Sequence, residues 1–167
     1  LKLAGALGLF WRMRSHLWSE GYRWLEIALQ NSDGAPKSVR AKALLSAGVL
    51  QFLQWRFDQA VTYFRESKDL YQELGDLNGV AEGTHWLGRY AFRKKEYSEA
   101  TKLLEASLEM YREANDQHGE LKTVRSLGDC ARLLEDYERS KRLYEQGLLL
   151  SQDSDNRLGA AGILNSL

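Results

Sequence analysis

Apolar and small side chains recur along the chain with a period of 40 residues. Four glycines follow one another at this interval: Gly8, Gly48, Gly88 and Gly128. Nine residues after each of the last three comes an aromatic residue: Phe57, Tyr97 and Tyr137. Self-similarity at a fixed period of about 20 to 50 residues is typical of stacked repeat arrays, in which each unit buries its apolar face against its neighbours.

The residues after each aromatic position predict a helix. A small residue follows after three positions, a bulky one after four more, and a second small one after three more. In chain order these residues are Ala60, Phe64 and Ser67; Ala100, Leu104 and Ser107; Ser140, Tyr144 and Gly147. Spacings of three and four residues keep them on one helical face, and small side chains let two helices approach closely. Each unit is therefore predicted to be a helix, a tight turn and an antiparallel helix.

Turn-forming residues separate the predicted helices. Turns inside the hairpins are expected at residues 54–57, 94–97 and 134–137. Between units, Gly75-Asp76 and Asn115-Asp116 combine a residue suited to a left-handed helix end with one suited to cap the next helix. Pro36 is placed to start a helix.

We predict one repeat domain over residues 1–167, with repeats at about 1–35, 36–78, 79–118 and 119–158 and the first helix of a further repeat at 159–167. The first repeat is irregular, because Gly21, Trp24 and Leu25 match the later second helices only after deletion of one residue. Core packing is expected for Trp24, and also for Trp11, Trp18 and Trp86. The chain begins without an initiator Met or a signal-peptide pattern, so we expect a fragment of a longer cytoplasmic protein.

Composition supports an all-α fold. The 167 residues include a single proline, and strong helix formers dominate. Together with the hairpin pattern, this predicts a right-handed superhelical solenoid of antiparallel helix hairpins. Lys plus Arg and Asp plus Glu number 23 each, so no overall charge favours nucleic acid or membranes as partners. No apolar run approaches the roughly 20 residues that span a bilayer.

The residues Leu87-Gly88, Tyr97, Ala100, Leu104 and Ser107 resemble the consensus of the tetratricopeptide repeat family. The 40-residue period is longer than the family's usual period of about 34. Residues 3–11 and 20–29 resemble the start of the repeat arm of MalT-like bacterial signalling ATPases and transcription regulators. The linker Gly75-Asp76-Leu77-Asn78-Gly79 also resembles the Gly-Asp-x-x-Gly linkers of scaffold proteins that bind peptide tails with 40-residue repeats.

The sequence contains no pattern typical of a catalytic or metal site. Residues 5–8 lack the Lys of a phosphate-binding loop and lie in a predicted helix. His16, His85 and His118 are far apart and no Cys cluster accompanies them, so neither a zinc site nor another cofactor is expected. Cys130, the single cysteine, is predicted to be a buried thiol that packs as a small hydrophobe. We therefore expect no enzymatic activity.

The resemblance implies that the first helix of each hairpin lines a concave groove. Leu45, Val49 and Phe52 would make the groove apolar in its N-terminal half, with Arg12 on the first helix. Its C-terminal half would be basic, with Glu82 at the start of the series and the following residues along it: His85, Arg89, Phe92, Arg93, Lys122, Arg125, Asp129 and Arg132. Arginine forks suit carboxylates or phosphates. Alternatively, these arginines pair with neighbouring acids and only solvate the face.

The function predicted from these features is a non-catalytic arm of a signalling or transcriptional regulator that senses a protein or peptide ligand. The alternatives are a passive peptide-binding scaffold and a domain that binds a small-molecule inducer. The expected partner is a protein or peptide with an acidic segment, without direct binding of nucleic acid or membranes. Among the tryptophans Trp55, in a predicted turn, is the candidate exposed anchor, but a packing contact beside the core is the favoured role for it. Self-association is also expected, through the apolar side of a helix at 157–167 that carries Ile163, Leu164 and Leu167.

Overall fold

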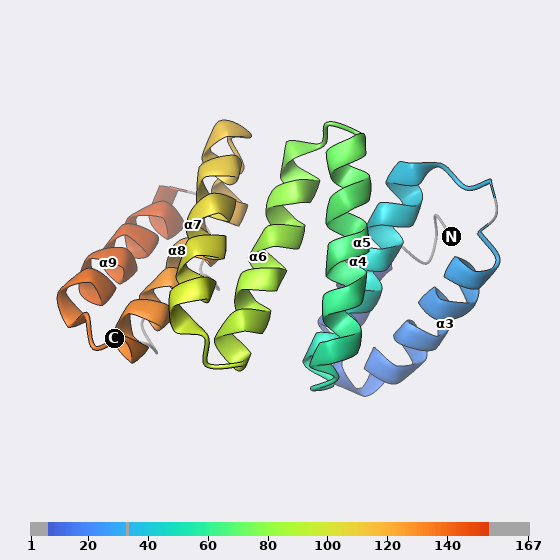
Figure 1. The fold of residues 1–167 in the computed structure, drawn as a ribbon, viewed down its shortest axis with the longest axis horizontal. Coiled ribbons are helices and arrows are strands. Elements are labelled where there is room, and N and C mark those ends of the chain that lie inside the picture. Colours follow the sequence, from blue (N-terminus) through green and yellow to red (C-terminus); the bar gives the residue numbers. More distant parts are fainter. Residues whose placement is uncertain (1–6, 33, 154–167) are drawn as a thin grey trace. The chain divides into compact units, whose positions relative to one another are not determined.

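The structure, a computed structural model, describes residues 7–32 and 34–153, and these residues form helices joined by short turns (Figure 1). In chain order the elements are α2 (Gly8–Arg12), the 3₁₀ helix η1 (Ser15–Leu17), α3 (Trp18–Gln30), α4 (Lys37–Leu53), α5 (Phe57–Glu73), α6 (Leu77–Arg93), α7 (Tyr97–Glu113), α8 (Gln117–Leu133) and α9 (Tyr137–Asp153). The prediction of an all-α, solenoid-type fold of helix hairpins is confirmed.

The 40-residue period of the sequence arises from the lengths of the helices. Each helix from α4 to α9 has 17 residues, and three residues separate neighbouring helices within this series. Two helices and two turns thus make one period. The first hairpin departs from this pattern because α2 ends at Arg12, so His16 lies in η1 and not on the first helix.

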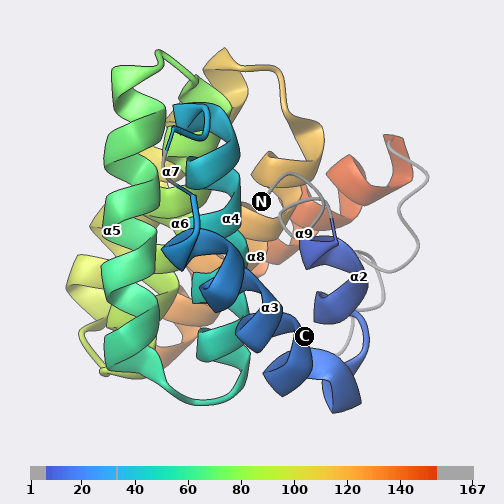
Figure 2. The same cartoon turned by 90° about the vertical axis from the view of Figure 1, so that its right-hand side faces the viewer.

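The described residues form two compact units, and the division falls inside α6, after Trp86. In unit 1, α4 packs against both α3 and α5 (Figure 2). One cluster of its apolar core draws on α2, α3 and α4 and consists of Trp11, Leu25, Ala43, Ala47 and Leu50.

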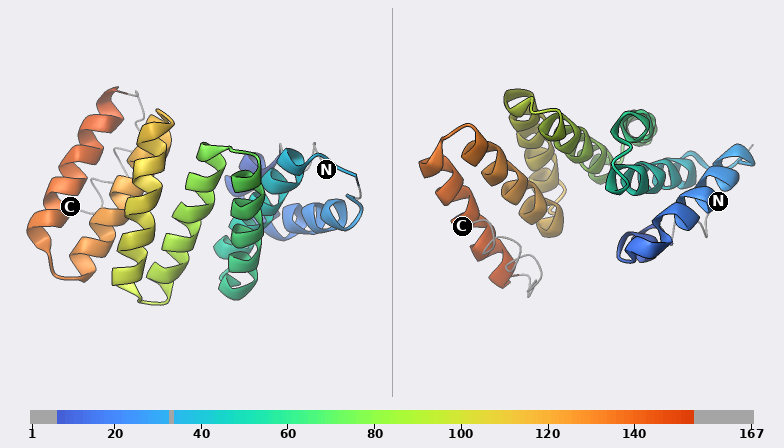
Figure 3. Two further views of the ribbon diagram at one scale, coloured as in Figure 1. Left: turned by 45° about the horizontal axis from the view of Figure 1, so that its top comes forward. Right: turned by 90° about the horizontal axis from the view of Figure 1, so that it is seen from below.

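In unit 2, α8 packs against both α7 and α9 (Figure 3). Its core draws on the end of α6 and on α7 and α8, and consists of Ala91, Ala100, Leu104, Leu108, Val124, Leu127 and Cys130. The predicted small and bulky positions of the second helix, Ala100 and Leu104, are fully buried.

Two of the repeated glycines allow the two helices of a hairpin to touch. A Cβ atom on Gly48 in α4 would lie 2.6 Å from Cε1 of Phe64 in α5. A Cβ atom on Gly128 in α8 would lie 2.5 Å from Cε1 of Tyr144 in α9. Both separations are shorter than a carbon–carbon contact allows. Phe64 and Tyr144 therefore require a glycine 16 positions earlier, at Gly48 and Gly128.

The helix ends follow one pattern. After each of five helices the third residue past the helix end donates its N–H to a carbonyl in the last turn, as Arg56 N does to Gln51 O at 3.0 Å. This is the Schellman arrangement, which satisfies carbonyls that the helix leaves open. At the next helix start, the Asp116 side chain accepts the Gly119 N–H at 2.9 Å, and Asp76 and Asp136 cap in the same way. The predicted caps at Asp76 and Asp116 are confirmed.

Only some of the residues with a left-handed backbone conformation are those that the sequence predicted. Gly75 and Asn115 have positive φ, as expected. The turns inside the hairpins, however, place Trp55, Lys95 and Glu135 in the same conformation, with φ between 62° and 64°. A left-handed backbone costs an L-residue roughly 1–2 kcal/mol, so these three turns are locally strained.

Replacement of Lys95 by glycine is expected to raise the free energy of unfolding by about 0.5–1 kcal/mol, because glycine adopts this conformation without a steric penalty. Lys102→Gly, in the middle of α7, should instead lower it by about 1 kcal/mol. Urea unfolding followed by circular dichroism measures both changes. A loss of stability in Lys95→Gly would contradict the assignment of strain to this turn.

The structure corrects one packing prediction. Trp24 is 57% exposed on α3, whereas Leu25 beside it is fully buried. The one-residue offset of the first repeat places Leu25, and not Trp24, at the position of Phe64 and Leu104. Trp11 and Trp86 are buried as predicted. The predicted helix at 157–167 lies outside the described residues.

Candidate functional site

A small pocket opens on the first helices of unit 1. Its volume is about 100 Å³, and its lining residues come from α2, α4 and α6: Gly8, Arg12, Leu45, Ser46, Val49 and Glu82. The sequence placed Arg12, Leu45, Val49 and Glu82 on the ligand-facing side of their helices, and the structure brings these four together. Three successive first helices therefore contribute to one surface.

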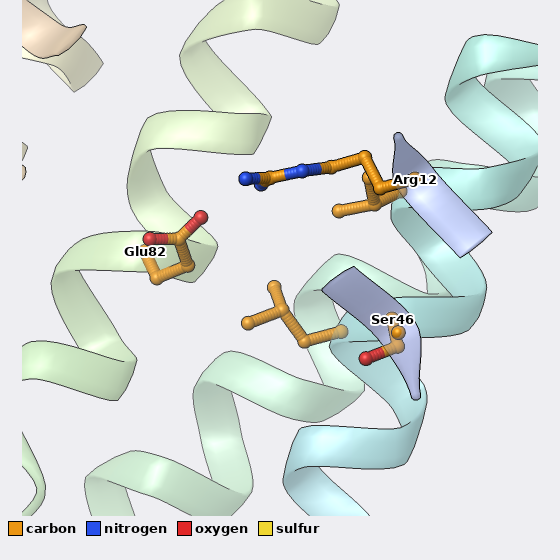
Figure 4. A pocket seen from close by; sticks show the side chains of 6 residues that line it. Arg12, Ser46 and Glu82 are labelled. Atoms are coloured by element: carbon orange, nitrogen blue, oxygen red, sulfur yellow. The ribbon is translucent and has the colours of Figure 1, made fainter. Parts of the chain in front are cut away.

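The pocket has an apolar floor between two opposite charges. Arg12 extends from α2 over one side of the pocket, and the Glu82 carboxylate faces it from α6 (Figure 4). Trp86 Nε1 donates to Oε1 of Glu82 at 2.8 Å, which orients the carboxylate. The Arg12 guanidinium is exposed and makes no hydrogen bond or ion pair within the described part of the chain. A bound anion would find a charged donor there.

Gly8 and Ser46 are pocket residues that the analysis of binding positions missed. A Cβ atom on Gly8 would lie 2.8 Å from Cβ of Ser46, so the glycine lets α2 come close to α4. The Ser46 hydroxyl donates to the Lys42 carbonyl oxygen at 2.9 Å and so is turned toward its own helix. The role of Gly8 at a helix contact could have been predicted from the 40-residue glycine period, because Gly8 aligns with glycines that lie at helix contacts.

The volume of the pocket limits what it can hold. Pockets for drug-sized molecules measure roughly 300–1,000 Å³. One of about 100 Å³ accommodates a side chain or a few atoms of a longer ligand. This geometry favours a peptide that crosses the surface over a small molecule that is enclosed by it.

In unit 2, the predicted basic face of α8 is smaller than expected. The Tyr144 hydroxyl donates to Oδ1 of Asp129 at 2.8 Å and also interacts with Arg132. The Lys122 ammonium lies 4.9 Å from the centre of the Tyr111 ring. These three α8 side chains thus help to hold neighbouring helices. Arg125, also predicted for this face, is exposed.

The last turns of α6 also belong to unit 2. Phe92 packs against the core cluster, and its ring centre lies 5.5 Å from that of Tyr97. Arg89 is half-buried and Arg93 is exposed. Phe92 therefore contributes to packing, and the arginines beside it are the accessible part of this segment.

Two residues proposed for the groove belong to the core of unit 1. His85 is 2% exposed and Phe52 is 4% exposed, so neither side chain can contact a ligand directly. The Phe52 ring packs against Phe57, Phe64 and Trp86, with ring centres 5.0, 6.3 and 5.3 Å away. Helical spacing predicted a ligand-facing side that is wider than the exposed surface, because aromatic side chains from α4, α5 and α6 pack together at this place. Val49 is also buried, although it lines the pocket.

A comparison with models of protein families matches residues 79–152 to the tetratricopeptide repeat. These residues run from the first turn of α6 to the last turn of α9. The match supports the tetratricopeptide repeat family.

Solved structures with tetratricopeptide-like folds agree with this result. RapI in its apo form has a TM-score of 0.79 at 15% identity, over 93% of this chain and 60% of that one. BtubC (BKLC) from P. vanneervenii has a TM-score of 0.71 at 16% identity, over 89% of this chain and 65% of that one. A putative kinesin light chain of Podospora anserina, described by its nearly identical TPR-like repeats, has a TM-score of 0.68 at 13% identity, over 99% and 92% of the two chains.

At these identities the likeness concerns the fold. The chain spans less than two thirds of the length of the RapI and BtubC structures. No curated protein matches the sequence.

The helices present little reactive chemistry among the described residues. Cys130 is fully buried, and burial raises the pKa of its thiol to about 11, so that it is neutral at physiological pH. A neutral buried thiol is a poor nucleophile, which agrees with its predicted packing role. No group of three or more His, Cys, Asp or Glu side chains in the described segments could hold a metal ion. None of the described helices combines the length and apolar character needed to cross a bilayer.

Proposed function

We propose that this chain is a non-catalytic protein-interaction module whose first helices bind an extended peptide segment of a partner. Tetratricopeptide repeats generally mediate protein–protein interaction. The observation that carries the proposal for this chain is the pocket to which α2, α4 and α6 all contribute. An extended ligand that crosses these helices gains contacts from each of them.

The side chains around the pocket suggest the chemistry of the ligand. An acidic side chain pairs with Arg12, and a neighbouring apolar side chain rests on Leu45 and Val49. Glu82 lies on the side of the pocket opposite Arg12 and repels a second carboxylate of the ligand. The affinity therefore depends on the order of charged residues along the peptide.

The proposal includes a biological setting. Because residues 3–11 and 20–29 resemble the repeat arm of MalT-like regulators, we assign the module to a cytoplasmic signalling protein in which the occupied surface shifts a switch. A ligand can do this only by binding two states of the protein with different affinities. The alternative function is a passive scaffold, which would bind the peptide on the same surface but would not be coupled to a switch. The pocket volume argues against a small-molecule inducer.

Arg12→Ala is expected to weaken binding of a peptide selected from a random display library by about 10- to 100-fold, because a hydrogen-bonded charge pair is lost. Leu45→Asp should weaken peptide binding by a similar factor, because the apolar contact with Leu45 is lost. Arg23→Ala removes an exposed arginine of α3 that does not line the pocket, so it serves as the matched control and should leave the affinity unchanged. Isothermal titration calorimetry measures all three.

Equal affinities in wild type, Arg12→Ala and Leu45→Asp would show that selected peptides bind elsewhere and would reject the proposed surface. Failure to select any peptide would reject peptide binding itself. Thermal unfolding of each variant shows whether a lost affinity reflects a lost fold.

A further inference from the structure

The two charged side chains of the pocket lie on its opposite sides. Arg12 comes from the last turn of α2, and Glu82 comes from the second turn of α6. Figure 4 shows these two side chains extending toward each other. A ligand that fills the pocket therefore meets a cation on one side and an anion on the other.

A second charge of the same sign accompanies each of these residues. Arg14, two residues after Arg12, is another exposed cation. On the other side, Asp76 caps the start of α6, the helix that carries Glu82. Burial, followed by the charges of Asp76 and Glu82, raises the pKa of Tyr71 to about 12. The α2 side of the pocket is thus basic and the α6 side is acidic.

The Glu82 carboxylate is oriented by a buried neighbour. Trp86 Nε1 donates to Oε1 of Glu82 at 2.8 Å, and the Trp86 side chain is buried. Glu82 itself is half-buried and lines the pocket. An ionised carboxylate has two oxygens and about four acceptor sites. Accepting the indole N–H is therefore compatible with accepting an ammonium or guanidinium group of a ligand as well.

The width of the site sets the spacing of charges along a ligand. The helix α4 contacts α2 where Gly8 meets Ser46, and it contacts α6 where the ring centres of Phe52 and Trp86 lie 5.3 Å apart. Helices in contact are roughly 8–10 Å apart, so the axes of α2 and α6 are separated by at most about 16–20 Å. The two charged ends extend inward from these axes (Figure 4). In an extended peptide, residues four positions apart face the same side and are about 13 Å apart, which matches this width.

We propose that the ligand of this pocket is a peptide segment with an acidic and a basic residue four positions apart and an apolar residue midway between them. The acidic side chain pairs with Arg12 and the basic side chain pairs with Glu82. The apolar side chain rests on Leu45 and Val49, where a volume of about 100 Å³ holds one such group. This inference rests on the proposed binding of an extended peptide and adds the second charge and the spacing.

Glu82 thereby determines specificity. If Arg12 alone recognised charge, a ligand with several acidic residues would bind as well as a ligand with one. Glu82 repels a second acidic residue on the α6 side and forms a charge-assisted hydrogen bond with a basic one. Since the preferred segment has no net charge, its affinity depends on the arrangement of the charges and not on their sum.

The probe is a display library of nine-residue peptides with leucine fixed at the centre and the other positions random, selected on the 167-residue chain. We expect the selected peptides to carry Asp or Glu two positions from the leucine on one side and Lys or Arg two positions from it on the other. One of them is then synthesised with its basic residue either kept or replaced by glutamine. Fluorescence anisotropy measures the affinities of both forms.

The replacement in the peptide should weaken binding to the wild-type chain about tenfold but binding to Glu82→Gln less than about twofold. Glu82→Gln keeps an oxygen that accepts the Trp86 N–H, and thermal unfolding verifies that the variant is folded. Glu20→Gln removes an exposed carboxylate of α3 that does not line the pocket. It is the matched control and should retain the full tenfold difference.

The results distinguish this inference from the proposed function. Peptides that depend on Arg12 and Leu45 but bind equally well with the basic residue or with glutamine would overturn the contact with Glu82 and leave peptide binding in place. The same holds if the selected peptides have acidic residues on both sides of the leucine, or if Glu82→Gln retains the tenfold difference. A library that yields no peptide, or affinities that Arg12→Ala leaves unchanged, would reject the proposed function and this inference with it.

Discussion

Phe64→Ala is expected to lower the free energy of unfolding by about 3–5 kcal/mol, the usual cost of removing a fully buried aromatic ring. Phe64 is completely buried in α5. Its ring stacks on Trp86, with centres 5.5 Å apart and planes 18° from parallel, and it lies 6.3 Å from Phe52. Loss of the ring leaves a cavity among rigid aromatic groups that cannot close around it. Urea unfolding followed by circular dichroism measures the change.

Tyr137→Ala provides the control, because Tyr137 occupies a regular repeat position but its side chain is largely exposed. We expect a change within about 0.5 kcal/mol. A loss below about 1.5 kcal/mol in Phe64→Ala would mean that the aromatic group repacks and is not the rigid centre of unit 1.

A double-mutant cycle tests why glycine recurs every 40 residues. Gly48→Ala alone should cost about 1–3 kcal/mol, because its Cβ atom would lie 2.6 Å from the Phe64 ring. In the Phe64→Ala background the same change should cost nothing or stabilise slightly, since the obstacle is gone and alanine is the better helix former. Additive effects in the cycle would contradict a direct contact between the two positions.

Gln51→Met is expected to raise the free energy of unfolding by about 1–3 kcal/mol. The Gln51 side chain is fully buried in α4, and neither Nε2 nor Oε1 has a hydrogen-bond partner within the described residues. A buried amide without partners has lost its hydrogen bonds to water and gained none in exchange. Methionine has a similar volume and no such requirement.

The later repeats support this expectation, because the positions that correspond to Gln51 are Ala91 and Ala131. The matched control is Gln59→Met on the exposed side of α5, for which we expect no change beyond about 0.5 kcal/mol. A Gln51→Met variant less stable than wild type would show that the amide contributes favourable interactions.

Local features of the fold could be predicted from the sequence. The 40-residue period, the Asp caps and the Gly and Asn helix ends correctly indicated the hairpins from α4 onward. These signals are local, since caps and helical faces depend on residues three or four positions apart. The turns that contain Lys95 and Glu135 were predicted, but the left-handed conformation of these two residues was not. It follows from the Schellman hydrogen bonds and not from a residue type that prefers it.

The candidate site could be predicted only in part. Leu45 and Val49 were assigned to the ligand-facing side and do line the pocket, but Phe52 and His85 were assigned to it and are buried. A single helix reveals which residues share a face, whereas the depth of each side chain depends on the helices packed beside it.

The sequence by itself determined that the chain is helical, that its helices pair as hairpins, and that small and bulky residues such as Ala100 and Leu104 lie on the packed face of the second helix. Only the tertiary structure decided that Arg12 and Glu82 face each other across one pocket and that Trp24 is exposed while Leu25 is buried. The physical reason is that helix formation and capping are short-range and leave a periodic pattern in the chain. Contacts between residues 30 or 70 positions apart depend instead on the volumes of all the side chains between the helices, and no repeat period encodes them.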